Sequence, residues 1–172
     1  TSLKQRYRAN GKSLFRVNNL HQNSISNNLQ NSIFKELEKN MSQIDLIVLS
    51  DFNYGVIPNA LLKKIISLAC KSDILIVADS QSSSQTGDIS RFKNMNLITP
   101  TEREARISMR DNQAGVIALM DSLQKKTESE NIILKMGADG ILINSIKDKD
   151  SFLTDKIEAL NTNPVDVSGA GD

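Results

Sequence analysis

Short, continuous apolar runs constrain the fold of this chain more than any other feature. IDLIVLS (residues 44–50), ILIVAD (74–79) and NIILK (131–135) each have the length and composition of a strand, and NLIT (96–99) reads as a shorter one. An unbroken apolar run is typical of a strand covered on both faces. We expect this of residues 44–50, and we expect 131–135 to be buried as well.

Helical patterns separate these strands. Residues 25–37 carry an apolar side chain at every fourth position, and Pro58 suits the first turn of a second helix. Residues 101–109 and 114–126 also read as helices. Strands that alternate with helices predict an α/β layered fold with a mainly parallel central sheet.

A hairpin is predicted at the N-terminus. Two runs of alternating character flank the pair Asn10-Gly11, whose residues tolerate the positive φ angles of a type I′ turn. In such a hairpin Lys4, Arg6 and Arg8 share one face. An isolated two-stranded ribbon is marginally stable, so we expect it to pack on the domain or to pair with a second copy as a homodimer.

A second hairpin is predicted near the C-terminus. GILINS (residues 140–145) pairs naturally with the strand at 131–135 across a turn at 137–140. The polar segment IKDKDSF (146–152) that follows reads as a surface turn.

Charge and residue counts exclude several classes of function. The 21 Lys and Arg against 20 Asp and Glu leave a net charge of +1, which predicts no general attraction to nucleic acid or to an anionic membrane. The apolar runs are too short to span a bilayer. Cys70 is the single cysteine, which fits a reducing compartment and hence the cytoplasm. His21 is the single histidine, so a histidine-rich metal site or a Ser-His-Asp triad is excluded.

The segment DVSGAGD (residues 166–172) carries the strongest chemical signal. Its glycines expose successive backbone N–H groups, and a helix that begins there adds its positive end, so the segment predicts an anion hole. Asp172 at the same helix start is placed to accept a proton from an attacking hydroxyl. The N–H groups of Ala170, Gly171 and Asp172 would stabilise the charge that develops. Taken alone, the segment also fits a glycine-rich turn that caps a helix.

Several segments in a fixed order carry a family resemblance. VLSDFNYG (48–55), VADSQ (77–81), LITPTEREA (97–105), ILKMGADGILI (133–143) and DVSGAGD resemble the ribokinase-like (PfkB) family of carbohydrate kinases, whose second signature is D-x-x-G-A-G-D. Within that family the chain looks most like the heptose-phosphate kinase domain of ADP-heptose synthesis, a step toward lipopolysaccharide precursors. The resemblance covers essentially the whole chain. It implies a ribokinase-like layered fold with a small β lid.

The resemblance implies ATP-dependent phosphorylation of a sugar or sugar phosphate hydroxyl, with ATP and Mg²⁺ as cofactors. Asp172 becomes the catalytic base, and Gly169, Ala170 and Gly171 form the anion hole. Glu104 matches the acidic residue of the family's N-x-x-E motif, which organises magnesium through water. Magnesium prefers oxygen ligands and keeps several waters.

The resemblance also assigns binding residues. Lys135 and Gly137 fall where the family contacts the nucleotide, Thr101 takes the Asn position of N-x-x-E, and Asp166 is the first residue of the signature. The hairpin becomes a lid over the sugar, and the candidates to bind a substrate phosphate are Lys4, Arg6 and Arg16.

Two acidic residues follow strands and are candidates to contact the sugar. Ligands of open α/β sheets bind at the carboxyl ends of the strands, and Asp51 and Asp79 stand there. Both also fit helix or turn caps. Glu104 in the same way fits a first-turn helix acid, and the basic residues of the hairpin fit a solvated face.

Three departures from the family pattern bear on the substrate. Thr101 replaces the motif's Asn. Ser80 and Gln81 replace the Pro and Lys that follow the Asp in many heptose kinases, and Tyr54 stands where those relatives carry Lys. Losing a charge-assisted contact weakens phosphate binding by roughly tenfold to a hundredfold. The alternatives are therefore a kinase of a free sugar or nucleoside, and a non-catalytic sugar- or nucleotide-binding relative.

The resemblance divides the chain into residues 1–18, the lid hairpin, and 19–172, part of a kinase domain truncated at both ends. The family pattern places a helix after the final motif and a sugar-binding region before the lid. We therefore expect the 172 residues alone to be inactive.

Overall fold

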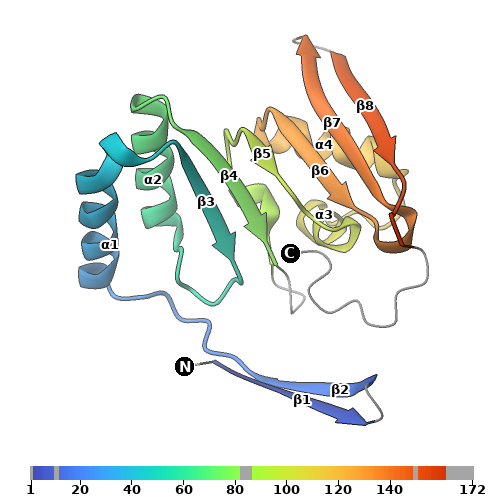
Figure 1. The fold of residues 1–172 in the computed structure, drawn as a ribbon, viewed down its shortest axis with the longest axis horizontal. Coiled ribbons are helices and arrows are strands. Elements are labelled where there is room, and N and C mark those ends of the chain that lie inside the picture. The colour runs from blue at the N-terminus through green and yellow to red at the C-terminus, as the bar shows by residue number, and fades with distance from the viewer. Residues whose placement is uncertain (1, 10–11, 82–86, 149–150, 162–172) are drawn as a thin grey trace.

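The computed structural model describes residues 2–9, 12–81, 87–148 and 151–161. They form a two-stranded hairpin and a layered α/β unit with a six-stranded sheet (Figure 1). Within these ranges, no helix is both long and apolar enough to cross a bilayer.

The sheet has the strand order β3-β4-β5-β6-β7-β8. Strands β3 (Leu46–Asp51), β4 (Leu75–Ser80), β5 (Leu97–Ile98) and β6 (Asn131–Lys135) run parallel to one another. Strands β7 (Ile141–Asp148) and β8 (Ser151–Ile157) complete it in antiparallel pairing. The predicted α/β fold with a mainly parallel sheet is confirmed, as is the predicted pairing of 131–135 with 140–145.

The described residues contain four α-helices: α1 (Asn27–Asn40), α2 (Asn59–Lys71), α3 (Glu102–Met109) and α4 (Val116–Thr127). Helices α2 and α4 contact the strands, and α1 packs on α2. Short 3₁₀ turns lie between α1 and β3 (η1, Met41–Gln43), between β4 and β5 (η2, Ile89–Arg91) and between β6 and β7 (η3, Gly137–Asp139). The Ser26 side chain caps α1 by accepting a hydrogen bond from the backbone N–H of Leu29, and Pro58 directly precedes α2. All four predicted helices are present within a few residues of their expected bounds.

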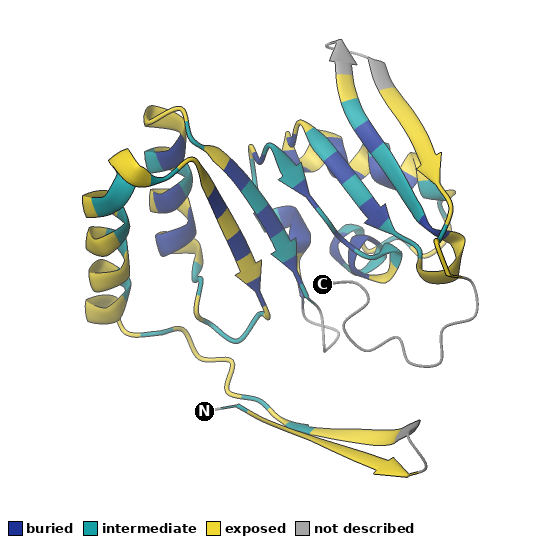
Figure 2. Cartoon of the chain, viewed as in Figure 1, coloured by how far each residue is buried: buried dark blue, intermediate teal, exposed yellow. Residues whose placement is uncertain are grey.

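The described part of the sheet is covered by helices on one face. In Figure 1 α4 lies behind β6 and β7, and no helix lies in front of the sheet. The core forms between this covered face and the helices, around Leu61, Ile76, Ile98, Leu123 and Leu134. Figure 2 shows the buried positions alternating along the strands.

The expectation that residues 44–50 form a strand covered on both faces is therefore wrong for the described chain. In β3 the side chains of Ile47 and Leu49 are buried, whereas Leu46 and Val48 are 48% and 60% exposed. The reason is that the described helices cover only one face of the sheet, so that alternate side chains of β3 lie on the uncovered face.

The expectation of a surface turn over residues 146–152 is also wrong. Strand β7 continues to Asp148, and β8 begins at Ser151, with Ile146 paired to Phe152. Strand β8 lies at the sheet edge and is held by backbone hydrogen bonds to one neighbour. Its polar and apolar residues follow no regular period, so the sequence pattern does not predict a strand there.

The N-terminal hairpin is confirmed. Strands β1 (Leu3–Ala9) and β2 (Lys12–Asn19) pair antiparallel, with a register shift between Tyr7 and Arg8. The turn residues Asn10 and Gly11 lie outside the described residues.

Candidate active site

The carboxyl ends of β3, β4, β5 and β6 meet at one edge of the sheet, on the side where the hairpin lies (Figure 1). Asp51 closes β3, Asp79 stands next to the end of β4, Thr101 follows β5 and Lys135 closes β6. Open α/β sheets bind ligands at this edge. The fold thus gathers four of the residues predicted from the sequence.

Asp79 and Lys135 form an ion pair across the sheet. Lys135 Nζ lies 3.1 Å from Asp79 Oδ1, and each side chain is 20% exposed. The same oxygen accepts a hydrogen bond from Thr99 Oγ1 at 2.9 Å. Because β5 separates β4 from β6, this pair joins two strands that do not touch. Two residues predicted to serve different ligands are therefore in direct contact.

Asp51 is buried and paired. Its carboxylate is 2% exposed and lies 2.6 Å from Arg91 Nη2, and its Oδ1 accepts a hydrogen bond from the backbone N–H of Asn53 at 3.0 Å. Arg91 also donates to the backbone oxygen of Ile57 at 2.8 Å and to Asn59 Oδ1 at 3.1 Å. Asp51 and Arg91 together fix the loop between β3 and α2. This geometry favours the interpretation of Asp51 as a turn cap.

Thr101 and Glu104 form a capping box at the start of α3. Thr101 Oγ1 accepts from the backbone N–H of Glu104 at 3.3 Å, and Glu104 Oε2 accepts from the backbone N–H of Thr101 at 2.8 Å. The Thr101 hydroxyl also lies 2.8 Å from Glu104 Oε2. Glu104 is 8% exposed. The replacement of Asn by Thr101 therefore keeps a capped helix start and a fixed carboxylate at this edge.

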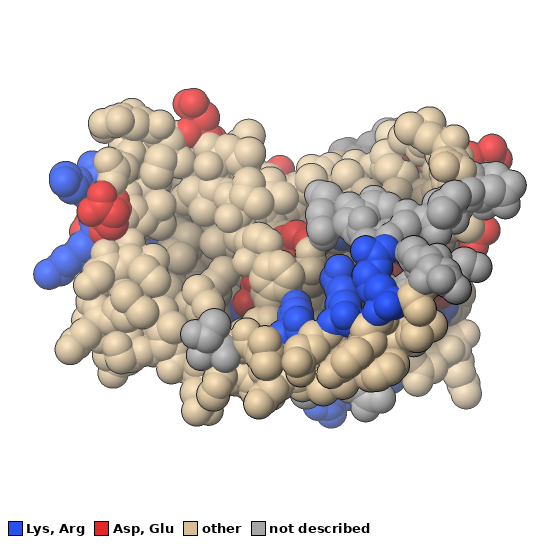
Figure 3. Space-filling model, turned by 60° about the horizontal axis from the view of Figure 1, so that its bottom comes forward, with Lys and Arg blue, Asp and Glu red and all other residues tan. Residues whose placement is uncertain are grey.

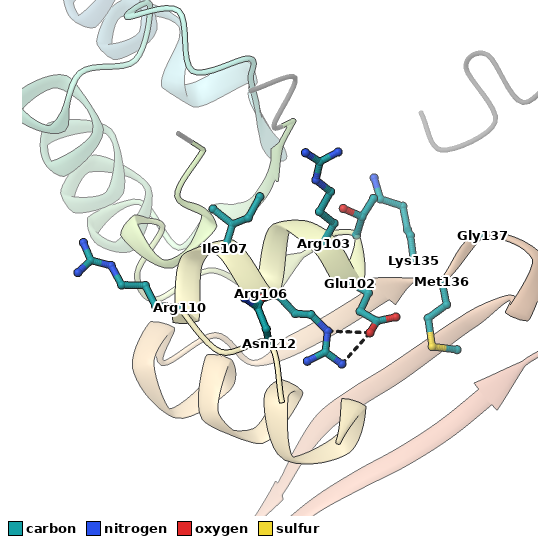
Figure 4. Close-up of a pocket in the computed structure, with 10 residues that line it drawn as sticks. Glu102, Arg103, Arg106, Ile107, Arg110, Asn112, Lys135, Met136 and Gly137 are labelled. Carbon is teal, nitrogen blue, oxygen red and sulfur yellow. Dashed lines mark hydrogen bonds and ion pairs between the residues drawn. The ribbon is translucent and has the colours of Figure 1, made fainter. Parts of the chain in front are cut away.

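A pocket of about 810 Å³ opens beside this helix start. Figure 4 shows the side chains of Arg103 and Lys135 extending toward the same open side, while Arg110 points away from them. Arg106 is paired with Glu102, Nη2 to Oε1, at 2.7 Å. The lining residues are Thr101, Glu102, Arg103, Arg106, Ile107, Arg110, Asn112, Lys135, Met136 and Gly137. Arg103 and Lys135 on the open side make this pocket suited to an anion.

A structured turn follows α3 at the rim of the pocket. Asp111 Oδ1 accepts hydrogen bonds from the backbone N–H groups of Ala114 and Gln113, both at 2.9 Å. These bonds, with a smaller contribution from the nearby Arg106 charge, hold the pKa of the Asp111 carboxyl below its usual value. Arg106 Nη1 also donates to the backbone oxygen of Ala114 at 3.1 Å.

The hairpin has a basic face. Arg6 and Arg16 are direct cross-strand partners. Lys4 lies two residues before Arg6 in β1 and therefore on the same face. Lys4 Nζ lies 4.8 Å from the ring centre of Phe52 and 5.0 Å from that of Tyr54. These cation–π contacts join the hairpin to the loop after β3. Figure 3, which brings the hairpin side forward, shows basic side chains in a row across it.

The opposite face of the hairpin is apolar. Tyr7 and Phe15 are cross-strand partners whose rings stack with centres 4.4 Å apart. Leu3 and Val17 lie on the same face, and all four side chains are exposed.

The remaining predicted residues divide into two groups. Gly137 lines the pocket and has a positive φ of 63°. Five residues lie outside the described residues, namely Asp166, Gly169, Ala170, Gly171 and Asp172. In the part of the chain that is described, no group of three or more His, Cys, Asp and Glu side chains is arranged to hold a metal ion.

Sequence reasoning missed four arginines. Arg103 and Arg106 are three positions apart on α3, a spacing typical of neighbouring side chains on a helix, so a search for charged stripes would find them. Arg110 follows the end of α3 with a positive φ of 55°. Arg91 meets Asp51 from 40 residues away, and no local pattern indicates that contact.

Two curated bacterial proteins are similar to this chain over its full length. The bifunctional protein HldE of Aliarcobacter butzleri is 30% identical over 176 residues, covering 100% of this chain and 35% of that protein. HldE of Helicobacter pylori is 27% identical over 180 residues, covering 100% of this chain and 36% of the relative. The chain thus spans about a third of the length of these curated relatives.

Solved structures share the fold. Phosphofructokinase-2 from Escherichia coli in complex with fructose-6-phosphate superimposes with a TM-score of 0.65 at 16% identity, over 99% of this chain and 54% of that one. Arabidopsis thaliana ribokinase complexed with ribose and ATP gives a TM-score of 0.62 at 12% identity, over 94% and 49%. The family described as pfkB family carbohydrate kinase matches residues 4–172. The chain belongs to this family and has its ribokinase-like fold.

Proposed function

We propose that this chain carries part of the active site of an ATP-dependent kinase that phosphorylates a hydroxyl of a sugar or sugar phosphate, with a heptose phosphate as the leading acceptor. The observation that carries the proposal is the basic pocket beside the Thr101–Glu104 capping box, at the sheet edge where this fold collects its polar loops. The family match supports the same reaction class.

The pocket fits the phosphates of a nucleotide. Arg103 offers a planar set of donors for bidentate contact, and Lys135 offers a compact charge beside it. Gly137 adopts a positive φ that other residues rarely take, and it leaves the backbone of the wall free of a side chain. We assign nucleotide binding to Lys135, Gly137 and Thr101. We assign the same role to Asp166 because it is the first residue of the segment DVSGAGD.

Glu104 is the candidate to meet magnesium through a water molecule. Its carboxylate is buried, and Thr101 holds Oε2 in place. A single fixed carboxylate fits an outer-sphere role, because magnesium retains several waters in nucleotide sites. Bound Mg²⁺–ATP supplies the phosphoryl group and neutralises part of its charge.

We assign the general base to Asp172 and the anion hole to Gly169, Ala170 and Gly171. This assignment rests on the segment DVSGAGD alone. A base within reach of the acceptor hydroxyl removes its proton as the hydroxyl attacks, while backbone N–H groups stabilise the transferred group.

The hairpin would act as the lid over the acceptor. Lys4, Arg6 and Arg16 present their charges on one face, and the contacts of Lys4 with Phe52 and Tyr54 bring that face to the loop after β3. We assign Asp79, near the end of β4, the role of accepting a hydrogen bond from a hydroxyl of the sugar. Asp51 supports this loop through Arg91.

One observation favours a second candidate, a kinase of an unphosphorylated sugar. Asn53 Nδ2 donates to Ser80 Oγ and to the backbone oxygen of Gln81, both at 3.1 Å. The loops after β3 and β4 are therefore joined by neutral groups, and two residues of these loops, Tyr54 and Gln81, stand where the resembled heptose kinases carry lysine. Neutral donors and acceptors suit hydroxyl groups better than a phosphate.

The apolar face of the hairpin supports a homodimer. A second copy that covered Leu3, Tyr7, Phe15 and Val17 would bury the largest exposed apolar group of the hairpin. The free thiol of Cys70 fits a reducing compartment, so we place the activity in the cytoplasm.

Turnover of the full-length protein tests the proposal. ADP release would be measured with Mg²⁺–ATP and a panel of acceptors that includes a heptose 7-phosphate, free hexoses and nucleosides. The proposal predicts that a sugar or sugar phosphate drives ADP release well above the rate with ATP alone. ATP binding without turnover of any acceptor would instead support the non-catalytic alternative.

A further inference from the structure

The ion pair between Asp79 and Lys135 links two parts of the site. Lys135 lines the basic pocket beside Gly137 and Thr101, whereas Asp79 stands at the end of β4 next to the loop of Ser80 and Gln81. The contact spans the intervening strand β5, and Thr99, the residue that follows this strand, donates a further hydrogen bond to Asp79 through its Oγ1. Both side chains are partly open to solvent, so a ligand on either side can reach one member.

We propose that Asp79 and a bound phosphate compete for the Lys135 ammonium, so that this pair couples nucleotide binding to acceptor binding. The inference rests on the proposed function, because it takes the pocket as the nucleotide side and Asp79 as the acceptor side.

The chemistry of lysine makes this competition strong. Its ammonium is a compact charge on a flexible stem, and it turns readily between neighbouring anions. While Asp79 holds Lys135 at 3.1 Å, part of the positive charge of the pocket is neutralised. A polyphosphate therefore enters a pocket whose positive charge is reduced by the Asp79 carboxylate. In the absence of an acceptor, Asp79 thus lowers the affinity for the nucleotide.

The reverse effect follows by linkage. When Lys135 turns toward a phosphate, Asp79 still accepts the hydrogen bond from the Thr99 hydroxyl. The carboxylate oxygen that had bound Lys135 can then accept another hydrogen bond. A sugar hydroxyl can then donate to it. Each ligand raises the affinity for the other by the same factor, typically fivefold to about 150-fold for coupled sites.

A double-mutant cycle on ATP binding tests the competition. The Kd of a non-hydrolysable ATP analogue with Mg²⁺ would be measured by calorimetry for the full-length protein and for Asp79→Asn, Lys135→Met and the double variant. Asparagine keeps the shape of Asp79 and an acceptor for Thr99 while removing the charge. We expect Asp79→Asn to tighten binding by about threefold or more, Lys135→Met to weaken it by about tenfold or more, and Asp79→Asn to have no effect in the Lys135→Met background.

A matched control separates this effect from a general loss of negative charge. Asp121 is a partly buried carboxylate that accepts a hydrogen bond from Asn144 Nδ2 at 3.2 Å, away from the pocket. Asp121→Asn should leave the Kd unchanged. Thermal unfolding of every variant shows that each one is folded under the conditions of the titration.

The two proposals fail in different ways. If Asp79→Asn leaves the Kd unchanged or weakens binding, or if it tightens binding equally in the Lys135→Met background, the competition is wrong while the kinase proposal stands. If the wild-type protein binds no ATP, the kinase proposal itself fails. Under the coupling account, the acceptor that drives ADP release also tightens binding of the ATP analogue in the wild type, and Lys135→Met abolishes that effect.

Discussion

Arg91 Nη2 lies 2.6 Å from Asp51 Oδ2, although 40 residues separate the two in the sequence. The pair joins η2 to the end of β3, and its aspartate is almost fully buried. Through this contact the loop of Phe52 and Tyr54 is held under Lys4 of the hairpin. The contact between the hairpin and this loop is therefore supported by a buried ion pair outside the hairpin.

Loss of Arg91 is expected to destabilise the protein. Arg91→Leu leaves the Asp51 carboxylate buried without its partner, which lowers the free energy of unfolding by about 3 kcal/mol. Chemical denaturation of the full-length protein measures it. Lys63→Ala, an exposed substitution on α2, should change stability by less than about 0.5 kcal/mol. Equal effects of the two substitutions would show that the pair does not hold the fold.

The Thr101 cap gives a second prediction. Thr101→Ala removes the side chain that accepts from the backbone N–H of Glu104, and we expect a loss of about 1 kcal/mol in unfolding free energy. Thr101→Asn keeps a capping oxygen and should retain wild-type stability. A full loss with asparagine as well would contradict the role of residue 101 as a helix cap.

The pocket arginines are expected to differ in their effect on ATP binding. Arg103 extends with Lys135 toward the open side, and Arg110 points away. Arg103→Ala should raise the Kd of ATP by about tenfold, the loss expected for one charge-assisted contact. Arg110→Ala is the matched control and should change the Kd by less than about twofold. Isothermal titration in two salt concentrations measures both, and similar effects at the two positions would argue against the assigned pocket.

The apolar face of the hairpin predicts the oligomeric state. Phe15→Glu places a charge beside Tyr7 on the face that a second copy would cover, and it should convert a dimer of the full-length protein to a monomer. Sedimentation velocity measures this change. Leu153→Glu alters an exposed apolar residue on β8 and should leave the mass unchanged. A wild-type monomer at micromolar concentration would rule out the dimer.

Much of the fold was readable from the sequence, because it is encoded in local patterns. The apolar residue at every fourth position of 25–37 predicts α1, and the unbroken apolar runs predict the parallel strands. The turn expected at residues 137–140 joins β6 to β7. Strand β8 was missed because an edge strand is held by its backbone and needs no regular side-chain pattern. The open face of β3 was missed because composition does not say which layer covers a strand.

The candidate site was predictable in its residues and less so in its contacts. Asp79 is predicted from its position after a strand, where parallel sheets collect ligands, and Thr101 and Lys135 are predicted from the family resemblance. Their mutual arrangement depends on which strands become neighbours. The ion pair of Asp79 with Lys135 crosses a strand, and sequence spacing carries no such information.

The most direct test of the central claim is the turnover of Asp172→Asn in the full-length protein, measured as ADP release at saturating Mg²⁺–ATP with the acceptor that the panel identifies. Removing a general base should lower kcat by about 10² or more while ATP binding stays within about threefold of wild type. Asp121→Asn serves as the control and should keep full activity. If Asp172→Asn turns over at a rate within about threefold of wild type, Asp172 is not the base, and the account of this chain as part of a sugar kinase active site is contradicted.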